Sequence, residues 1–166
     1  MPYYFAYGSN MNTARVEARI GATRRALPGV LHDHALCFDK ASRVSGISHA
    51  NVVAMPGERV EGALFELLAP AQIESMDPFE GYPHDYDRRR MSIDTGRGPI
   101  EAWVYIAAPG TTGESLRPAR EYLEHLLAGE AFLSADYHAR LSGVASVEGL
   151  DDATLESLGL SRHSAR

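Results

Sequence analysis

The opening of the chain changes its hydrophobic pattern within a few residues. Aromatic and small residues alternate over residues 3–7, which is typical of a half-buried strand, because successive side chains of a strand point to opposite faces. The turn-forming tripeptide Gly8-Ser9-Asn10 interrupts this alternation. From Asn12 onward, the apolar residues Val16 and Ile20 lie at the spacing of one helix face. The pattern predicts a strand, a tight turn and a short amphipathic helix.

The middle of the chain carries short apolar runs bounded by turn residues, a pattern that is typical of β-strands. Alternate residues from Val30 to Phe38, among them His32 and His34, are expected to share one face. The dipeptide Pro56-Gly57 separates two of the runs, which we expect to pair as a hairpin. The expected strands cover residues 24–39, 51–55, 60–67, 86–94 and 100–107.

Later segments return to helical spacing. The first of these helices is expected to end near Asp77, because Pro78 disfavours helical backbone angles in the residue before it. At the end of the chain, residues 161–166 are expected to be loose. Helices are predicted over residues 69–77, 118–128 and 136–141, and a last one where Leu155, Leu158 and Leu160 could dock.

Composition and charge narrow the functional classes. Of the 166 residues, 45% are hydrophobic and 23% are charged, which is ordinary for a soluble globular protein of one domain. The formal net charge of -6 disfavours sequence-independent binding to nucleic acid, which needs a basic surface. No apolar run is long enough to span a membrane, and the chain begins without a secretory signal. We therefore expect no nucleic-acid partner and no membrane partner.

Cysteine and histidine content bears on metals and on the redox setting. Cys37 is the single cysteine, which excludes an internal disulfide and a multi-cysteine zinc site and fits the reducing cytoplasm. Its apolar neighbours favour a buried, inert thiol over a nucleophile. His32 and His34 have a spacing that could hold a metal, but no third ligand is evident nearby. We therefore expect neither a metal nor a cofactor.

The Gly8-Ser9-Asn10 turn is the first candidate for chemistry. A turn between a strand and a helix can point several backbone N–H groups at one spot, at the positive end of the helix dipole, and so bind an anion. Glycine can also adopt backbone angles that are closed to other residues. The sequence contains neither a P-loop nor a G-x-G-x-x-G pattern, so a small anion is favoured over a nucleotide. A simply capped turn is the alternative.

Glu80 is the second candidate. It follows a predicted helix and lies between Phe79 and Gly81, with Tyr82 next in the chain. Apolar and aromatic neighbours would desolvate its carboxyl and raise its pKa toward the range that is useful for proton transfer. The alternative is one more exposed loop carboxylate, since loops tolerate charge.

Two charged features near Glu80 have structural interpretations. Asp77 precedes a proline and is expected to cap the backbone locally. The run Arg88-Arg89-Arg90 lies on a predicted strand and could bind phosphate. A solvated face with one inward ion pair is the more common outcome for such a run, and we expect it here.

Two motifs in the chain together resemble the γ-glutamylcyclotransferase family. Residues 4–11, Tyr-Phe-Ala-Tyr-Gly-Ser-Asn-Met, are similar to its opening signature. The segment Asp77-x-x-Glu80-Gly81-Tyr82-Pro83, with Tyr86 and Arg88 after it, is similar to its catalytic-glutamate segment. Each motif is short, but both motifs in this order and at this separation are specific. Weaker similarity to the family's central strand and to the C-terminal helices of bacterial members extends the match over residues 3–144.

The resemblance implies an α+β fold, a small mixed closed β-barrel flanked by helices. The single domain would cover residues 1–147, with a weakly structured extension over residues 148–166. The implied activity is that of an enzyme of the lyase or acyltransferase class, which converts a γ-glutamyl amide to 5-oxoproline and a free amine without a cofactor. Glu80 would be its acid/base, the turn would hold the substrate's α-carboxylate, and the implied substrate-binding residues are Tyr7, Gly8, Ser9, Asn10 and Tyr105.

Several alternatives stay open at the level of the sequence. The same pocket could belong to a non-catalytic module for amino-acid-like ligands, or to an enzyme that removes a γ-glutamyl protecting group from a biosynthetic intermediate. The Gly-Ser-Asn form of the turn argues against the glutathione-specific and γ-glutamylamine-specific branches, and the leaving amine is not identified. The expected partner is the small-molecule γ-glutamyl substrate in the cytoplasm, in γ-glutamyl peptide and glutathione metabolism. The oligomeric state is open, with a homodimer as one option.

Overall fold

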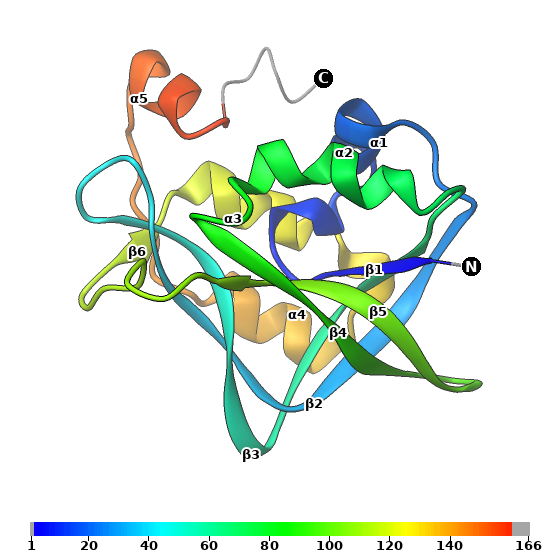
Figure 1. Ribbon diagram of the computed structural model, residues 1–166. Helices are drawn as coiled ribbons and strands as arrows, with labels where there is room; N and C mark the ends of the chain where they lie inside the picture. The colour runs from blue at the N-terminus through cyan, green and yellow to red at the C-terminus, as the bar shows by residue number, and fades with distance from the viewer. Residues whose placement is uncertain (1, 161–166) are drawn as a thin grey trace.

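Five strands form a small closed β-barrel in the computed structural model, which describes residues 2–160 (Figure 1). The strands follow the order β1-β5-β4-β2-β3, and β1 also pairs with β3, which closes the barrel. β1 is parallel to β5, and the other pairs around the barrel are antiparallel. The predicted mixed barrel is confirmed. The strands are β1 Tyr3–Ala6, β2 Arg25–Ala41, β3 Ile47–Glu66, β4 Tyr86–Thr95 and β5 Gly98–Ala107, and the short β6 Arg117–Pro118 pairs with β3.

Helices pack around the barrel and complete the α+β fold. In the view of Figure 1, α1, α2 and α5 lie above the strands. Among the residues that the structure describes, no helix is long and apolar enough to cross a membrane. The segment expected to be loose, residues 161–166, lies outside the described residues. The helices are α1 Thr13–Ile20, α2 Ala71–Glu80, α3 Arg120–Leu127, α4 Ala135–Ser142 and α5 Asp152–Ser157, with two 3-10 helices, η1 Ser9–Met11 and η2 Glu130–Phe132.

The ring of Phe5 is fully buried and lies against strands β2 and β3. Two strand glycines make room for it, because a Cβ at Gly62 would lie 2.9 Å from the ring and a Cβ at Gly29 would lie 3.3 Å from it. Glycine within a strand often marks such a close approach. Since Phe5 is on β1 and β1 leads directly into η1, the packing of this ring also fixes the position of the turn that follows.

The strands β2 and β3 form one long bent ribbon, and the predicted hairpin between residues 51–55 and 60–67 is wrong. Both runs belong to β3, and both pair with β2. Between them the register shifts, and residues 55–58 loop outward at the lower edge of Figure 1. There Asp33 Oδ1 accepts a hydrogen bond of 3.0 Å from the backbone N–H of Gly57. The Pro-Gly signal therefore marks a bulge rather than a turn between paired strands.

The same bulge overturns the expected face of β2. Leu31 is buried in the core, whereas Val30 is partly exposed and His32 is exposed. Asp33 has a φ of 58°, and the pairing with β3 shifts between His32 and His34. A residue in this left-handed conformation breaks the alternation of a strand, so residues before and after it do not share the face that a simple period of two predicts.

Helix α2 continues through Pro78 to Glu80, so its predicted end near Asp77 is wrong. Proline removes one backbone donor, but this loss falls in the last turn of the helix, which ends two residues later. Gly81 then adopts a φ of 65°, and its N–H donates to the carbonyl oxygens of Asp77 and Pro78. Glu80 is therefore a helical residue, held by the end of α2 rather than by a loop.

The three leucines expected to dock a last helix are buried, which confirms that prediction. Leu155, Leu158 and Leu160 join the hydrophobic core at or just after α5. Asp151 caps the start of the helix, because its carboxylate accepts a hydrogen bond of 2.8 Å from the N–H of Thr154. The boundary predicted between residues 147 and 148 stays a prediction.

Candidate active site

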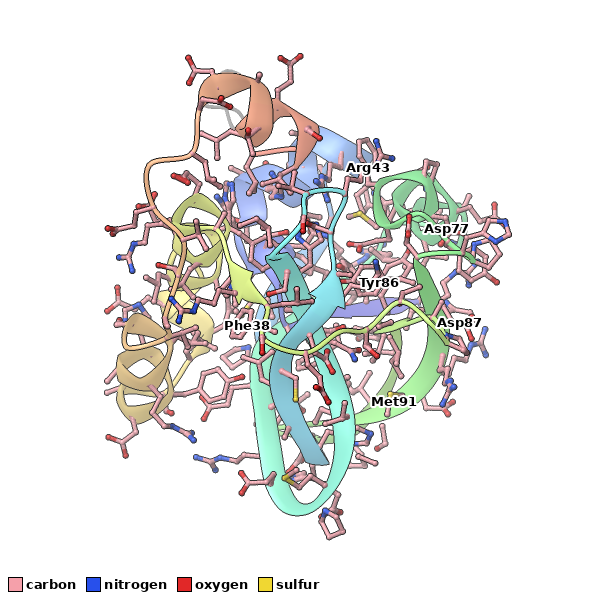
Figure 2. The ribbon with its side chains drawn as sticks, turned by 90° about the vertical axis from the view of Figure 1, so that its left-hand side faces the viewer. Phe38, Arg43, Asp77, Tyr86, Asp87 and Met91 are labelled. Carbon is pink, nitrogen blue, oxygen red and sulfur yellow. The ribbon has the colours of Figure 1, made fainter. Side chains whose placement is uncertain are left out.

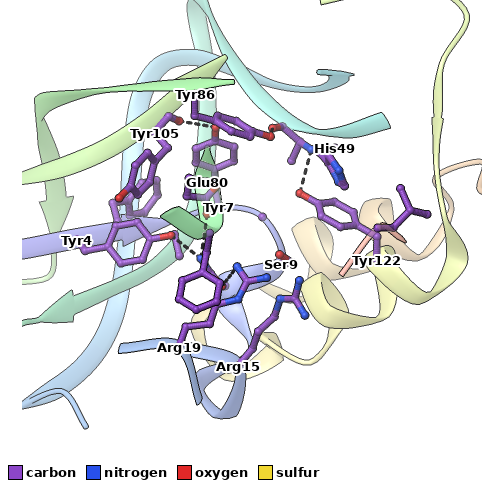
Figure 3. Close-up of a pocket in the computed structure, with 17 residues that line it drawn as sticks. Tyr4, Tyr7, Ser9, Arg15, Arg19, His49, Glu80, Tyr86, Tyr105 and Tyr122 are labelled. Atoms are coloured by element: carbon purple, nitrogen blue, oxygen red, sulfur yellow. Dashed lines mark hydrogen bonds between the residues drawn. The ribbon is translucent and has the colours of Figure 1, made fainter. Parts of the chain in front are cut away.

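The end of α2, the start of α1 and the turn after β1 meet at a cavity of about 110 Å³ (Figure 3). Five buried tyrosines form much of its wall. The structure brings together every residue that was predicted for the site, although these residues come from separate parts of the chain. The six predicted residues that line the cavity are Tyr7, Gly8, Ser9, Asn10, Glu80 and Tyr105.

Asn10 holds the carboxyl group of Glu80. Its side-chain nitrogen donates to Glu80 Oε1 at 3.1 Å and to the hydroxyl of Tyr4 at 2.9 Å. Asn10 is 3% exposed, so its amide has few orientations open to it. The residue predicted to contact substrate thus also fixes the candidate acid/base, from a turn seventy positions away in the chain.

Burial raises the pKa of Glu80, as expected, but through different neighbours. Phe79 is 53% exposed and Tyr82 is 37% exposed. Tyr82 lies under the guanidinium of Arg88, 4.7 Å from it, rather than over the carboxyl. The enclosure comes instead from the barrel, and desolvation there disfavours the charged carboxylate. The positive charges of Arg19 and Arg15 oppose this effect on the pKa.

Glu80→Gln is expected to make the ligand-free protein more stable than the wild type between about pH 7 and pH 8. A group whose pKa is raised on folding stabilises fully below its unfolded pKa, about 4.3 for glutamate, and this contribution is lost as pH rises through the folded pKa. Glutamine has no such loss, so the difference should shrink near pH 4. Paired thermal melts across this range measure it. A mutant that gains stability toward acid pH instead would show that Glu80 is held as a stabilised anion.

The turn after β1 owes its glycine to a close contact. Gly8 has a φ of -109°, so it does not adopt the left-handed conformation that most often calls for glycine. A Cβ at Gly8 would instead lie 2.9 Å from the hydroxyl oxygen of Tyr122. That hydroxyl also accepts a hydrogen bond of 2.9 Å from the N–H of Ala50. The side chain of Tyr122 therefore occupies the space that a larger residue would need.

The same turn uses some of its own backbone donors. The N–H of Met11 donates to the carbonyl of Gly8 at 3.0 Å, and the N–H of Asn12 donates to that of Ser9 at 3.2 Å. Burial raises the pKa of Tyr122 to about 12, and the hydrogen bond from the N–H of Ala50 opposes this rise. Fewer N–H groups are therefore left for an anion than a bare helix start would offer.

Tyr7 and Tyr105 are linked to each other and to α2. The hydroxyl of Tyr7 donates to the backbone carbonyl of Tyr105 at 2.5 Å. The hydroxyl of Tyr105 in turn donates its one proton to Asp77 Oδ1 at 2.7 Å, and its oxygen lies 3.3 Å from the carbonyl oxygen of Ile73. Burial raises the pKa of both phenols, so both are neutral near pH 7. Their rings line the cavity while their hydroxyls brace the wall behind it.

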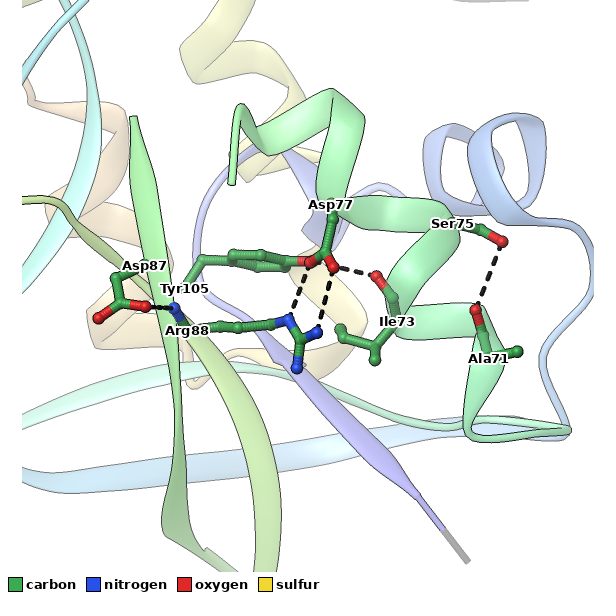
Figure 4. A network of polar contacts seen from close by, with 7 residues as sticks. All are labelled: Ala71, Ile73, Ser75, Asp77, Asp87, Arg88 and Tyr105. Carbon is green, nitrogen blue, oxygen red and sulfur yellow. Dashed lines mark hydrogen bonds and ion pairs between the residues drawn. The ribbon is translucent and has the colours of Figure 1, made fainter. Parts of the chain in front are cut away.

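Asp77 is an ion-pair partner rather than a local cap, so that interpretation is corrected (Figure 4). Arg88 Nε lies 2.9 Å from Asp77 Oδ1, and Arg88 Nη2 lies 3.1 Å from Asp77 Oδ2. Two parallel bonds of this kind fix the orientation of the guanidinium plane relative to the carboxylate plane. Arg89 and Arg90 are exposed, which confirms one inward pair and a solvated face. The ion pair ties α2 to β4 and thereby positions the turn of α2 that carries Glu80.

Asp77→Ala is expected to lower the free energy of unfolding by about 3 kcal/mol, because removal of one partner leaves a poorly solvated charge unpaired. The side chain of Arg88 is 13% exposed, and Tyr105 would also lose its acceptor. Asp94→Ala is the matched control, since its pair with His32 is more than half exposed on both sides. Urea unfolding of both variants measures the difference. Equal losses in the two would show that the Asp77–Arg88 pair does not brace the helix.

Arg15, Arg19 and His49 also line the cavity, and the hydrophobic pattern of the chain does not predict this. Figure 3 shows the guanidinium groups of Arg15 and Arg19 beside Ser9. Their four-residue spacing within the first helix is a signal that could have found them, because it places both on one side of a helix that follows the turn. Burial and nearby cations lower the pKa of His49 to about 4, so this imidazole is neutral near pH 7.

The remaining candidates lie outside the cavity. Cys37 is partly rather than fully buried, and burial raises the pKa of its thiol, which disfavours the reactive thiolate. His32 contacts Asp94 at 3.1 Å, and His34 contacts the carbonyl of His32 at 2.9 Å. Within residues 2–160, no three histidine, cysteine or acidic side chains are grouped closely enough to hold a metal.

Comparisons with known proteins identify the family. A family model described as gamma-glutamyl cyclotransferase, AIG2-like, matches residues 4–126, and the chain therefore belongs to this family. A solved structure of a gamma-glutamyl cyclotransferase is 23% identical with a TM-score of 0.77, over 90% of this chain and 91% of that one. An uncharacterized protein from Homo sapiens is 23% identical, with a TM-score of 0.76 and 90% of each chain covered.

A more distant structure shares the same fold. A cyclotransferase from yeast that is specific to glutathione is 12% identical, with a TM-score of 0.61 over 98% of this chain and 97% of that one. Identities this low show the common barrel and carry no statement about substrate. Among curated protein sequences, none matches the chain.

Proposed function

We propose that the protein cyclises a γ-glutamyl amide to 5-oxoproline and releases the free amine. The observation that carries this proposal is the position of the Glu80 carboxyl, which shares a small cavity with the Gly8-Ser9-Asn10 turn and has a raised pKa. Membership of the gamma-glutamyl cyclotransferase family supports the same reaction class. A raised pKa makes a carboxylate a better base, and the positive charges of Arg19 and Arg15 oppose this rise in the pKa.

The reaction needs one proton to move between two nitrogen atoms. The α-amine of the substrate attacks its own side-chain carbonyl, and a new bond forms between this nitrogen and the γ-carbon. Glu80 takes the proton that the amine gives up and then donates it to the departing amide nitrogen, whose bond to the γ-carbon breaks. A single carboxyl can do both steps in sequence. Because the attack is intramolecular, most of the catalytic effect comes from holding a folded conformer.

The rest of the cavity supplies binding rather than covalent chemistry. The turn after β1 would hold the α-carboxylate, and the neutral rings of Tyr7 and Tyr105 would contact the glutamyl chain. The nucleophile belongs to the substrate, so the proposed chemistry uses no covalent intermediate and calls for no metal or cofactor. The single, unreactive cysteine fits a cytoplasmic setting for this reaction.

A substrate panel tests the proposal. The purified protein is incubated with γ-glutamyl amino acids, γ-glutamyl amines and glutathione, and both 5-oxoproline and the released amine are quantified. We expect equal amounts of the two products from at least one member of the panel. Binding without product would instead support a ligand-binding module, and release of glutamate would indicate hydrolysis.

A further inference from the structure

Two guanidinium groups stand beside the candidate acid/base. Arg15 and Arg19 line the same small cavity as Glu80, and among residues 2–160 no carboxylate forms an ion pair with either of them. We propose that Arg15 and Arg19 bind the α-carboxylate of the substrate's glutamyl part and make a free α-carboxylate a requirement for turnover. This inference rests on the proposed function and adds to it the residues that select the substrate.

The side chain of Arg15 is the more deeply buried candidate for binding the carboxylate. It is 8% exposed, and its Nε has no hydrogen-bond partner among the described residues. Its Nη1 donates to the carbonyl of Gly159 at 3.1 Å, which anchors the guanidinium against the segment after α5. A buried cation without a counter-ion is costly, and a bound carboxylate would compensate this cost. Burial and the charge of Arg19 lower its pKa to about 10, so Arg15 is still charged near pH 7.

Arg19 connects the same region to the acid/base. Its Nη1 donates to Asn10 Oδ1 at 3.4 Å, and its guanidinium lies 5.0 Å from the centre of the Phe79 ring. The amide of Asn10 therefore joins Arg19 on one side to Glu80 on the other. An anion bound by the two arginines would lie next to the turn, at a fixed position relative to the base. That arrangement places the neighbouring α-amine where Glu80 can deprotonate it.

A second cavity beside the first is available to the leaving amine. A wider cavity of about 440 Å³ adjoins the first, and both Glu80 and Arg19 border the two cavities. Its wall includes Lys40, Arg43 and Glu156, and Figure 2 shows Arg43 on the loop after β2, on the side of the molecule where α5 lies. We call the smaller cavity the inner cavity and the wider one the outer cavity. Arg15 borders the inner cavity and does not border the outer one. A carboxylate held by Arg15 therefore belongs to the glutamyl part rather than to the leaving group.

The experiment compares three substrates of the full-length protein. These are a γ-glutamyl amino acid, the same compound with its α-carboxylate converted to a carboxamide, and the same compound with the leaving amino acid amidated. In the wild type, the first change should lower kcat/KM by about tenfold or more, the size of one lost hydrogen bond to a charged group. Arg15→Gln should lower kcat/KM for the free α-carboxylate by a similar factor, mainly through KM, and leave little difference between the first two substrates.

The controls separate binding from positioning. Arg97→Gln removes an exposed arginine far from the cavity and should keep the wild-type preference for a free α-carboxylate. Arg19→Gln should weaken that preference as Arg15→Gln does, and it keeps the test open if Arg15→Gln melts too low to assay.

Three results would overturn the inference. The first is an equal loss on all three substrates, which would mean that the arginines only tune Glu80. The second is a loss of discrimination confined to the amidated leaving group, which would place them at the outer cavity. In the third, the wild type is active but has no preference for a free α-carboxylate. A wild type that forms no 5-oxoproline from any substrate would overturn the proposed function itself.

Discussion

Glu80→Gln is expected to lower kcat for 5-oxoproline formation by about a hundredfold or more while KM changes only a few-fold. Glutamine keeps the length of the side chain and an oxygen that can accept the bond from Asn10 Nδ2, now 3.1 Å long. It cannot take a proton from the α-amine. Since the turn and the arginines that would bind the carboxylate are untouched, the loss should fall on the chemical step rather than on binding.

A matched control is available on the same helix. Glu74 is exposed in the first turn of α2, away from the cavity, so Glu74→Gln should retain wild-type kinetics. Steady-state assays of the two variants on one γ-glutamyl substrate make the comparison. If Glu80→Gln turned over as fast as Glu74→Gln, the Glu80 carboxyl would have no part in the mechanism.

Gly8→Val is expected to lower the free energy of unfolding by about 1 to 3 kcal/mol, the usual cost of overpacking. It should also raise KM more than Ser9→Ala does. The added Cβ would lie 2.9 Å from the Tyr122 hydroxyl and 3.4 Å from Ala50 Cβ, so the turn or the tyrosine must shift. Ser9→Ala removes one hydroxyl and leaves the path of the backbone in place. Thermal melts and KM values of both variants test the order.

Two further variants show whether the contact with Tyr122 is the cause. Gly96→Val adds the same side chain where a Cβ meets no atom within 4 Å, and it should have little effect. Gly8→Ala adds the Cβ alone, and Tyr122→Phe removes the oxygen that this Cβ would meet. The double variant should therefore be more stable than the sum of the single losses predicts. Additive losses, or a larger KM effect for Ser9→Ala than for Gly8→Val, would contradict the role given to the backbone of the turn.

Hydrophobic patterns over a few residues predict much of this fold, because the strands and helices that they indicate depend mainly on residues close in the sequence. The alternation of residues 3–7 and the helical spacing after Asn12 describe elements whose geometry depends on near neighbours. The hairpin at Pro56-Gly57 failed for the opposite reason. A Pro-Gly pair signals a change of direction, but the choice between a turn and a bulge depends on the partner strand, and β2 was long enough to pair on both sides of it.

The candidate site, like the fold, could be predicted from the sequence only in part. The turn and Glu80 could be found from short motifs, because each is specified by adjacent residues and by resemblance to a family. The causes of their properties were long-range and could not be found. The pKa of Glu80 is raised by the barrel rather than by Phe79, and Gly8 is required by Tyr122, which lies on α3. The position of the Arg15 guanidinium at the cavity depends on its hydrogen bond to Gly159, which is far away in the sequence.

The central claim is that the substrate's own amine, and not water, attacks the γ-carbonyl. The most direct test is to run the reaction on a γ-glutamyl amino acid in water labelled with oxygen-18, the heavy oxygen isotope, and to analyse the products by mass spectrometry. We predict unlabelled 5-oxoproline in an amount equal to the released amino acid, formed about a hundredfold or more slowly by Glu80→Gln. Glutamate that carries heavy oxygen in its γ-carboxylate would contradict the claim, because it would show that the protein is a hydrolase.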